Sequence, residues 1–433
     1  MPHSTQAGSQ TLRFSLAAKW FVIALTIRLL ATWGMNLYLE SKGAEYAISG
    51  DAQGYWILGQ AIANGDDYAV HTPPRYVHRM PGFPLLLAVA NAIGCNNQAS
   101  ARYVVAAFCA LSVPAIGWLA SLLGYSPKQQ QWAMICATFH PWLIATSPIL
   151  LTDTPFGVGL VLSVAGIVWV FQQSTPQEPS SKVLTRLGIA AFAGILAIFF
   201  RPSWILFLFA ACAVAPFCFR AVQTSLKYRL GLSCCYLILL GLFLSPWILR
   251  NYMVTNHFVP LSLWMGPSLY DGLHPEATGI SDMRFFDQDQ FPLTMSEFEV
   301  NQHYTQLAFG WAKQNPSRVL ELAFIKQQRY WGLLPTNLAV SSLRVRIALG
   351  LSSLFVIGFL ITGVIRGREW KRPLLLATPV LYFALLHCLF VGSIRYRLPA
   401  ELPLMIVAGI AIAGSSAGKT EPLKPNTSTD DQG

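Results

Sequence analysis

Two features of the sequence, its composition and its apolar runs, predict an all-α, polytopic membrane protein with about ten transmembrane helices. Hydrophobic residues make up 54% of the 433-residue chain, and only 12% of residues are charged. Apolar runs of about 20 residues recur along the chain, which is the length that a helix needs to cross a bilayer. We therefore expect a bundle of membrane-spanning helices.

The first apolar segment, from Phe14 to Leu39, begins near Arg13 and Lys19. It is too long for a signal peptide and lacks a convincing small-residue cleavage site, so we expect it to remain as the first span. The other expected spans are residues 101–123, 131–150, 154–173, 187–200, 203–219, 230–249, 347–365, 373–392 and 397–415. The segment from Phe83 to Ile93 is too short to cross, and we expect a helix that lies at or dips into the membrane interface.

Basic residues in the short connectors predict the orientation of the spans. The connectors on one side carry Lys128, Lys182, Arg186, Arg220, Lys227, Arg229, Arg366, Arg368, Lys371 and Arg372. The positive-inside rule makes this side cytoplasmic and places both termini there. Of the 20 acidic residues, 15 then lie in or beside the outer regions. We expect the chemistry to face the periplasm or exterior of an inner (plasma) membrane, with a bacterial inner membrane preferred.

Residues 1–415 are expected to form one transmembrane domain with two long outer segments. The first spans residues 40–100, and the second, residues 251–346, is expected to form a small helical cap. In the cap, one helical pattern follows Ser296 and a second one follows Asn315-Pro316. Residues 416–433 are rich in small and polar residues and are expected to form a disordered cytoplasmic tail.

Several other function classes find no support. The net charge of +10 does not indicate a nucleic-acid partner, because no basic patch alternates with stacking aromatic residues. The eight cysteines are scattered, most of them within apolar runs, and show neither a disulfide framework nor a C-x-x-C metal motif. Zinc-protease and phosphate-loop motifs are also lacking. We identify no certain cofactor and no metal ligand set, although a divalent cation is possible.

The predicted topology brings polar residues from distant segments to one membrane face. Asp51 follows the first span in Gly50-Asp51-Ala52-Gln53-Gly54-Tyr55, where a carboxylate could cap a helix or act as a base. Tyr55 is either an interfacial anchor or a surface on which a sugar stacks. Asp153, between two apolar spans, is either another helix cap or a carboxylate that positions a substrate. His78 and Arg79 belong to the same set.

Four arginines from three later segments lie at the same predicted rim. Arg201 precedes Pro202, Arg250 follows Pro246-Trp247-Ile248-Leu249, and Arg395 and Arg397 flank Tyr396. Guanidinium groups bind phosphate oxygens in a two-pronged geometry and keep their charge, so these residues could clamp a lipid phosphate. Snorkelling to the surface and non-specific binding of headgroups are the alternatives.

The order of these motifs resembles the GT-C glycosyltransferases, in particular the protein O-mannosyltransferases and lipid A aminoarabinose transferases (glycosyltransferase family 39-like). The motifs that carry the resemblance are Gly50-Asp51 with Tyr55, Arg79-Met80-Pro81-Gly82-Phe83-Pro84-Leu85, Thr152-Asp153-Thr154-Pro155-Phe156, Arg201-Pro202, Pro246-Trp247-Ile248-Leu249-Arg250-Asn251-Tyr252 and Arg395-Tyr396-Arg397-Leu398-Pro399. They extend over nearly the whole membrane portion of the chain.

The resemblance implies a polyprenyl-phosphate-linked hexose or pentose as donor and a hydroxyl on a glycan, lipid or protein as acceptor. It implies that Asp51 deprotonates this hydroxyl, with inversion at the anomeric carbon. Asp153, Tyr55 and His78 are then expected to position the acceptor or sugar. Arg79, Arg201, Arg250, Arg395 and Arg397 are expected to bind the donor phosphate. A transporter or flippase of lipid-linked sugars is the alternative, although transporters usually place their functional charges nearer the bilayer midplane.

Overall fold

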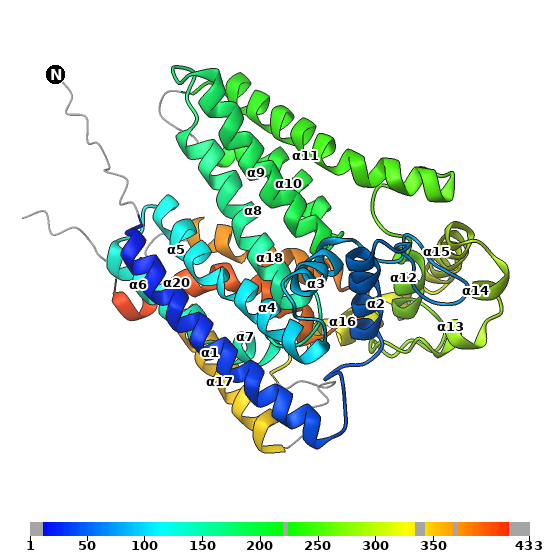
Figure 1. The fold of residues 1–433 in the computed structure, drawn as a ribbon. Coiled ribbons are helices and arrows are strands. Elements are labelled where there is room, and N and C mark those ends of the chain that lie inside the picture. Colours follow the sequence, from blue (N-terminus) through cyan, green and yellow to red (C-terminus); the bar gives the residue numbers. More distant parts are fainter. Residues whose placement is uncertain (1–11, 220–223, 334–342, 367–370, 415–433) are drawn as a thin grey trace, which may run out of the picture.

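The computed structural model describes residues 12–219, 224–333, 343–366 and 371–414, and the regular elements of these residues are all helices (Figure 1). Only one isolated β-bridge, between Val70 and Arg75, occurs in this part of the chain. The expected all-α fold is thus confirmed. The predicted tail, residues 416–433, falls outside the described residues.

Six helical segments are long and apolar enough to cross a membrane, so the chain is a multi-pass membrane protein. They are α1 (Phe14–Ser41), α4 with α5 (Gln98–Ala110 and Ser112–Leu122), α8 (Asp153–Gln173), α9 (Ser180–Phe200), α11 (Leu226–Thr255) and the run of α19, η1 and α20 (Ile394–Arg397, Leu398–Leu404 and Met405–Ala413). Shorter apolar helices are α3 (Gly82–Ala92), α10 (Trp204–Cys218) and most of α18 (Lys371–Leu386). A further long helix is α17 (Leu343–Arg366).

The segment expected to span at residues 131–150 is instead divided into two short helices, α6 (Pro127–Thr138) and α7 (Pro141–Thr146). His140 between them has extended backbone angles, with φ −66° and ψ 112°. Pro141 explains the break, because a proline disfavours the helical conformation of the residue before it and lacks an amide hydrogen. The expected short helix at residues 83–93 is present as α3.

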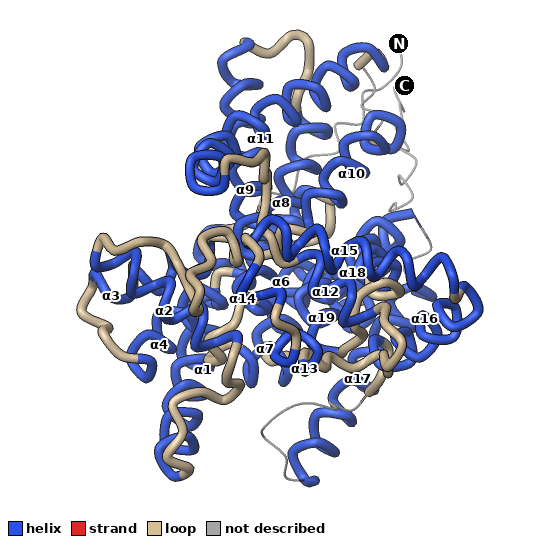
Figure 2. The backbone as a smooth tube through the Cα atoms, turned by 90° about the vertical axis from the view of Figure 1, so that its right-hand side faces the viewer, coloured by secondary structure: helices blue, strands red, loops and turns tan. Residues whose placement is uncertain are grey.

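Helix α8 lies at the centre of the bundle, and α5, α9 and η1 pack against it. Figure 1 shows α8 to α11 standing together on one side of the molecule, and Figure 2 shows the same group from a direction turned by 90°. Gly159 and Gly166 of α8 face Ala197 and Ala190 of α9, and a Cβ atom on either glycine would come within 3 Å of an alanine Cα atom. Small residues spaced by seven therefore allow these two helices to approach closely.

The cap contains α12 (Met265–Gly272), α13 (Arg284–Gln288), α14 (Phe291–Thr294), α15 (Glu297–Gln314) and α16 (Pro316–Tyr330). Ser296 begins α15 with a capping box to Glu299, as the sequence pattern predicts. The carboxylate of Glu297 accepts hydrogen bonds from the amides of Tyr76 and Val77, at 2.9 and 3.0 Å. The cap is thereby joined to the first long loop, which leads from α2 (Asp51–Asn64) to α3.

The close approach of α8 and α9 makes Gly166→Ala a test of the fold. We expect the added methyl group to destabilise the protein by about 1–3 kcal/mol, the usual cost of over-packing. Gly188→Ala in α9 is the matched control, because a Cβ atom added at Gly188 would meet no atom within 4 Å and alanine favours a helix. The measurement is the thermal unfolding midpoint in detergent micelles, and equal midpoints for the two variants would contradict this packing.

Candidate functional site

Asp51 is the first residue of α2, where the preceding Gly50 has a positive φ of 74°. Glycine adopts this backbone conformation without the steric cost that other residues incur. The Asp51 side chain makes no capping hydrogen bond. Its carboxylate oxygens instead contact arginines from two other segments. The structure therefore does not support the interpretation of Asp51 as a helix cap.

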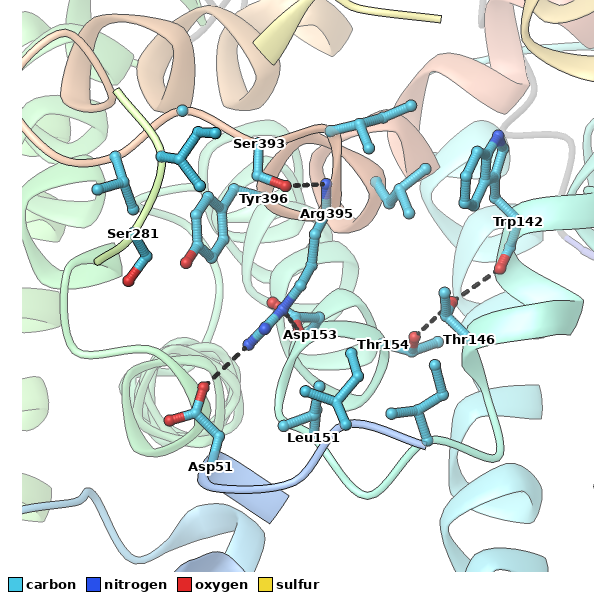
Figure 3. Close-up of a pocket in the computed structure, with 17 residues that line it drawn as sticks. Asp51, Trp142, Thr146, Leu151, Asp153, Thr154, Ser281, Ser393, Arg395 and Tyr396 are labelled. Carbon is cyan, nitrogen blue, oxygen red and sulfur yellow. Dashed lines mark hydrogen bonds and ion pairs between the residues drawn. The ribbon is translucent and has the colours of Figure 1, made fainter. Parts of the chain in front are cut away.

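Arg395 lies between two carboxylates that are far apart in the sequence (Figure 3). Its Nε atom is 2.5 Å from Oδ2 of Asp153, and its Nη2 atom is 3.5 Å from Oδ2 of Asp51. Nη2 of Arg79 is 2.5 Å from the other oxygen of Asp51. The starts of α2, α8 and α19 therefore meet at one ion-pair network.

The network lowers the pKa of Asp51. Burial raises this pKa, but the positive charges of Arg79 and Arg395 and their hydrogen bonds outweigh the effect of burial. About 38% of the Asp51 side chain remains exposed, so the carboxylate is accessible as well as charged. A carboxylate held in this way can accept a proton or a hydrogen bond from a bound molecule.

Arg201 approaches the network from the end of α9. Its Nη1 atom is 3.9 Å from Oδ1 of Asp153 and, although buried, has no hydrogen-bond partner within the described part of the protein. Its guanidinium lies over three aromatic rings, those of Phe156, Phe383 and Tyr396, at 4.8 to 5.6 Å. These rings hold the guanidinium of Arg201 in place, and its Nη1 remains able to donate a hydrogen bond to a bound molecule.

A cavity of about 230 Å³ opens beside the network. Asp51, Asp153 and Arg395 line its polar part, and Ser281 of the cap and Thr154 add hydroxyl groups. The remaining wall is largely apolar and consists of Ile48, Trp142, Ile149, Leu151, Val391, Ile394 and Leu398, with Thr146, Gly392, Ser393, Ile280 and Tyr396 beside them. Figure 3 shows Asp51 and Arg395 pointing toward one another across this space.

Comparison with known proteins finds similarity in the sequence and in the fold. Residues 76–262, less than half of the chain, match the family of dolichyl-phosphate-mannose-protein mannosyltransferases. An oligosaccharyltransferase of Archaeoglobus fulgidus, solved as a complex with Zn and sulfate, has a TM-score of 0.50 at 12% identity, over 92% of this chain and 49% of that chain. The chain has the GT-C fold. The resemblance found in the sequence is confirmed.

The chain spans about half the length of the oligosaccharyltransferase that it matches, 49%. ArnT from Cupriavidus metallidurans bound to undecaprenyl phosphate is also similar, with a TM-score of 0.44 at 12% identity, over 92% of this chain and 78% of that chain. No curated protein sequence matches.

Two of the residues expected to position a substrate, Tyr55 and His78, are not part of the cavity wall. Tyr55 is buried under Arg79, whose guanidinium lies 5.1 Å from the centre of its ring. His78 is buried against Trp264, with ring centres 4.2 Å apart. Burial, followed by the charge of Arg79, lowers the pKa of His78 well below its usual value, so this histidine is neutral.

Two of the expected phosphate-binding arginines contact protein carbonyls instead. Arg250 donates hydrogen bonds to the carbonyls of Tyr76, at 2.6 Å, and Tyr68, at 3.2 Å. Arg397 is buried, pairs with Glu401 and donates to the carbonyl of Tyr330 at 2.9 Å. Neither arginine lines the cavity, so the structure brings together Asp51, Arg79, Asp153, Arg201 and Arg395 from the predicted set.

The sequence interpretation missed several cavity residues. Tyr396 lies between the two arginines of the Arg395-Tyr396-Arg397 motif, and this position could have identified it as a site residue. Trp142 follows the helix break at Pro141 and donates its indole N–H to Ser353 at 3.0 Å. Ser281 lies in a turn-rich stretch, and nothing in its sequence neighbourhood marks it.

The described residues do not form a metal site in this arrangement. Among them, no group of three or more histidine, cysteine or acidic side chains is close enough to hold an ion. The carboxylates of Asp51 and Asp153 are already engaged by arginines, whose charge opposes the approach of a cation. The charges of the network therefore favour an anion over a cation.

The contacts of Arg250 predict that it positions the loop that carries Arg79. Arg250→Gln should speed cleavage of residues 66–78 by a protease several-fold, because two carbonyls of this loop lose their charged donor. Arg284→Gln is the control, since Arg284 is exposed and pairs with the nearby Asp282. Unchanged cleavage combined with weaker binding of a lipid phosphate would instead indicate a phosphate contact.

Proposed function

We propose that this protein transfers a sugar from a polyprenyl-phosphate donor to an acceptor hydroxyl, with Asp51 as the general base. The observation that carries the proposal is the placement of Asp51, an accessible carboxylate at a cavity and within an arginine cluster. The family match supports the donor class, because the family is described by its use of a dolichyl phosphate sugar. We infer that the site faces the periplasm or exterior, on the side opposite the basic connectors.

In the proposed reaction, the acceptor hydroxyl enters the cavity and gives its proton to Asp51. The acceptor oxygen forms a bond to the anomeric carbon while the bond from that carbon to the phosphate oxygen breaks. The polyprenyl phosphate leaves with the bonding electron pair, and the proton stays on Asp51 until water removes it. Attack from the side opposite the phosphate inverts the anomeric configuration.

The arginines supply the electrostatic part of the mechanism. Negative charge grows on the departing phosphate, and fixed cations stabilise it without reorganising at the moment of reaction. Arg201 has unused donor capacity, and Arg79 and Arg395 complete a cluster of three guanidinium groups around two carboxylates. The net positive charge of these five side chains favours an anion. Asp153 acts as a positioning residue, because it holds Nε of Arg395 at 2.5 Å.

Replacement of the base tests this function directly. Asp51→Asn should lower transfer by about 10²–10⁴-fold, the usual contribution of a general base. Membranes that contain the protein are incubated with radiolabelled polyprenyl-phosphate hexoses and pentoses, and transfer of label to glycan, lipid or protein is measured. Asp66→Asn is the control, because Asp66 is exposed beyond the end of α2.

Full transfer by Asp51→Asn would remove Asp51 as the base. Movement of the lipid-linked sugar across the membrane by the wild type, without transfer to any acceptor, would favour a flippase. The two outcomes are separable, because the first concerns the variant and the second concerns the wild-type protein.

The ion pairs of Asp51 predict a pH dependence. The base works when deprotonated, and Arg79 and Arg395 lower its pKa, so wild-type activity should persist into acidic solution. Arg79→Gln removes a stabilising charge and should raise the pKa of Asp51, which moves the acid limb of the kcat/KM profile to higher pH. Arg284→Gln should leave the acid limb in place, since Arg284 is exposed, pairs with Asp282 and is not one of the charges that shift the pKa of Asp51. A shift to lower pH in Arg79→Gln would contradict the assignment.

A further inference from the structure

Helix α16 exposes an apolar ridge and buries two side chains that carry polar groups. Its outward ridge consists of Leu320, Phe324 and the C-terminal Trp331, whose exposed fractions are 73%, 66% and 47%. Its inward side carries Lys326 and Tyr330, and both are fully buried. Positions 320, 324 and 331 fall on one side of a helix, because the spacings between them are close to one and two whole turns.

Three polar side chains of α16, two of them buried, donate hydrogen bonds to main-chain carbonyls of α18 and of the turn after it. The hydroxyl of Tyr330 donates to the carbonyl of Val380 at 2.9 Å, and Nε2 of Gln327 donates to that of Ala384 at 2.5 Å. Nζ of Lys326 donates to Leu389 at 2.7 Å. The three donors lie at positions 326–330 of α16, which is about 6 Å along its axis at a rise of 1.5 Å per residue.

The C-terminal end of α16 is also supplied with a donor from the protein. Nη1 of Arg397 lies 2.9 Å from the carbonyl of Tyr330 and 3.3 Å from that of Gly332. The last carbonyls of a helix lack partners within the helix. Water can satisfy such groups in solution, but in a bilayer only the protein can. Arg397 therefore provides what a helix end inside a membrane requires.

Exposed leucines of α18 and the turn after it lie next to the carbonyls that bind α16. Leu381, Leu385 and Leu389 of α18 and the turn after it are exposed, with fractions of 43%, 74% and 42%. Leu381 follows Val380 and Leu385 follows Ala384, whose carbonyls accept hydrogen bonds from α16, and the carbonyl of Leu389 itself accepts one. The exposed leucines therefore lie beside the residues that contact α16. Two helices that are hydrogen-bonded to one another thus both expose apolar side chains.

We propose that α16 is partly embedded in the membrane beside α18, with Leu320, Phe324 and Trp331 in contact with bilayer lipid. The helix is thus a part of the cap that enters the bilayer. The inference depends on the multi-pass fold alone and is independent of the proposed sugar transfer.

Photocrosslinking tests the lipid contact. The photoreactive amino acid benzoylphenylalanine replaces Phe324 or, separately, Leu320 in full-length protein in nanodiscs of phosphatidylethanolamine and phosphatidylglycerol. After irradiation, intact mass spectrometry should show covalent phospholipid adducts at a level several-fold above that of the same probe at Glu299, an exposed position in α15. Leu385 of α18 is the positive control.

Adducts at positions 320 and 324 no more frequent than at 299 would overturn the proposal. Crosslinked dimers in place of lipid adducts would also overturn it, because a second copy of the chain would then cover the ridge. A probe at Leu320 keeps the test decisive if replacement of Phe324 prevents folding. As a second measurement, Phe324→Asp should lower the thermal midpoint in nanodiscs more than Gln328→Asp, a replacement at an exposed polar position of the same helix.

Discussion

The ion-pair network of Arg395 is the constraint on which the site depends. A charged group in a poorly hydrated region is costly unless an opposite charge and hydrogen bonds compensate it. Arg395 satisfies this condition through Asp153 and Asp51, and Asp51 in turn holds Arg79. The beginnings of α2, α8 and α19 must therefore meet at one point, and the helices that follow them are oriented by this requirement.

The membrane fold was predictable because span length and apolar composition are local properties of the sequence. α1, α8, α9 and α11 follow directly from such runs. The break in the run at 131–150 was harder, because the residues on both sides of His140 are apolar and only Pro141 disrupts the helix. Hydropathy measures the preference for lipid, whereas a helix break depends on backbone hydrogen bonds.

The candidate site was predictable in part, because topology brings distant charges to one face without specifying their partners. Asp51, Asp153 and Arg395 do converge. Arg250 and Arg397 resemble Arg395 in the sequence, since each lies near a proline at the same rim. Their side chains nevertheless donate to carbonyls of the first loop and of α16. Which arginine faces a cavity depends on which carbonyls lie within reach after packing, and one sequence does not contain this information.

The same network links donor binding to the reactivity of the proposed base. In the proposed function, a donor phosphate bound at this site would compete with Asp51 and Asp153 for the guanidinium groups of Arg79 and Arg395. As an arginine moves toward the phosphate, Asp51 loses a compensating charge, and its carboxylate becomes a stronger base. Both of these arginines contact Asp51 in this structure, and they lower its pKa. The arrangement therefore favours deprotonation of an acceptor hydroxyl when a donor is present to react with it.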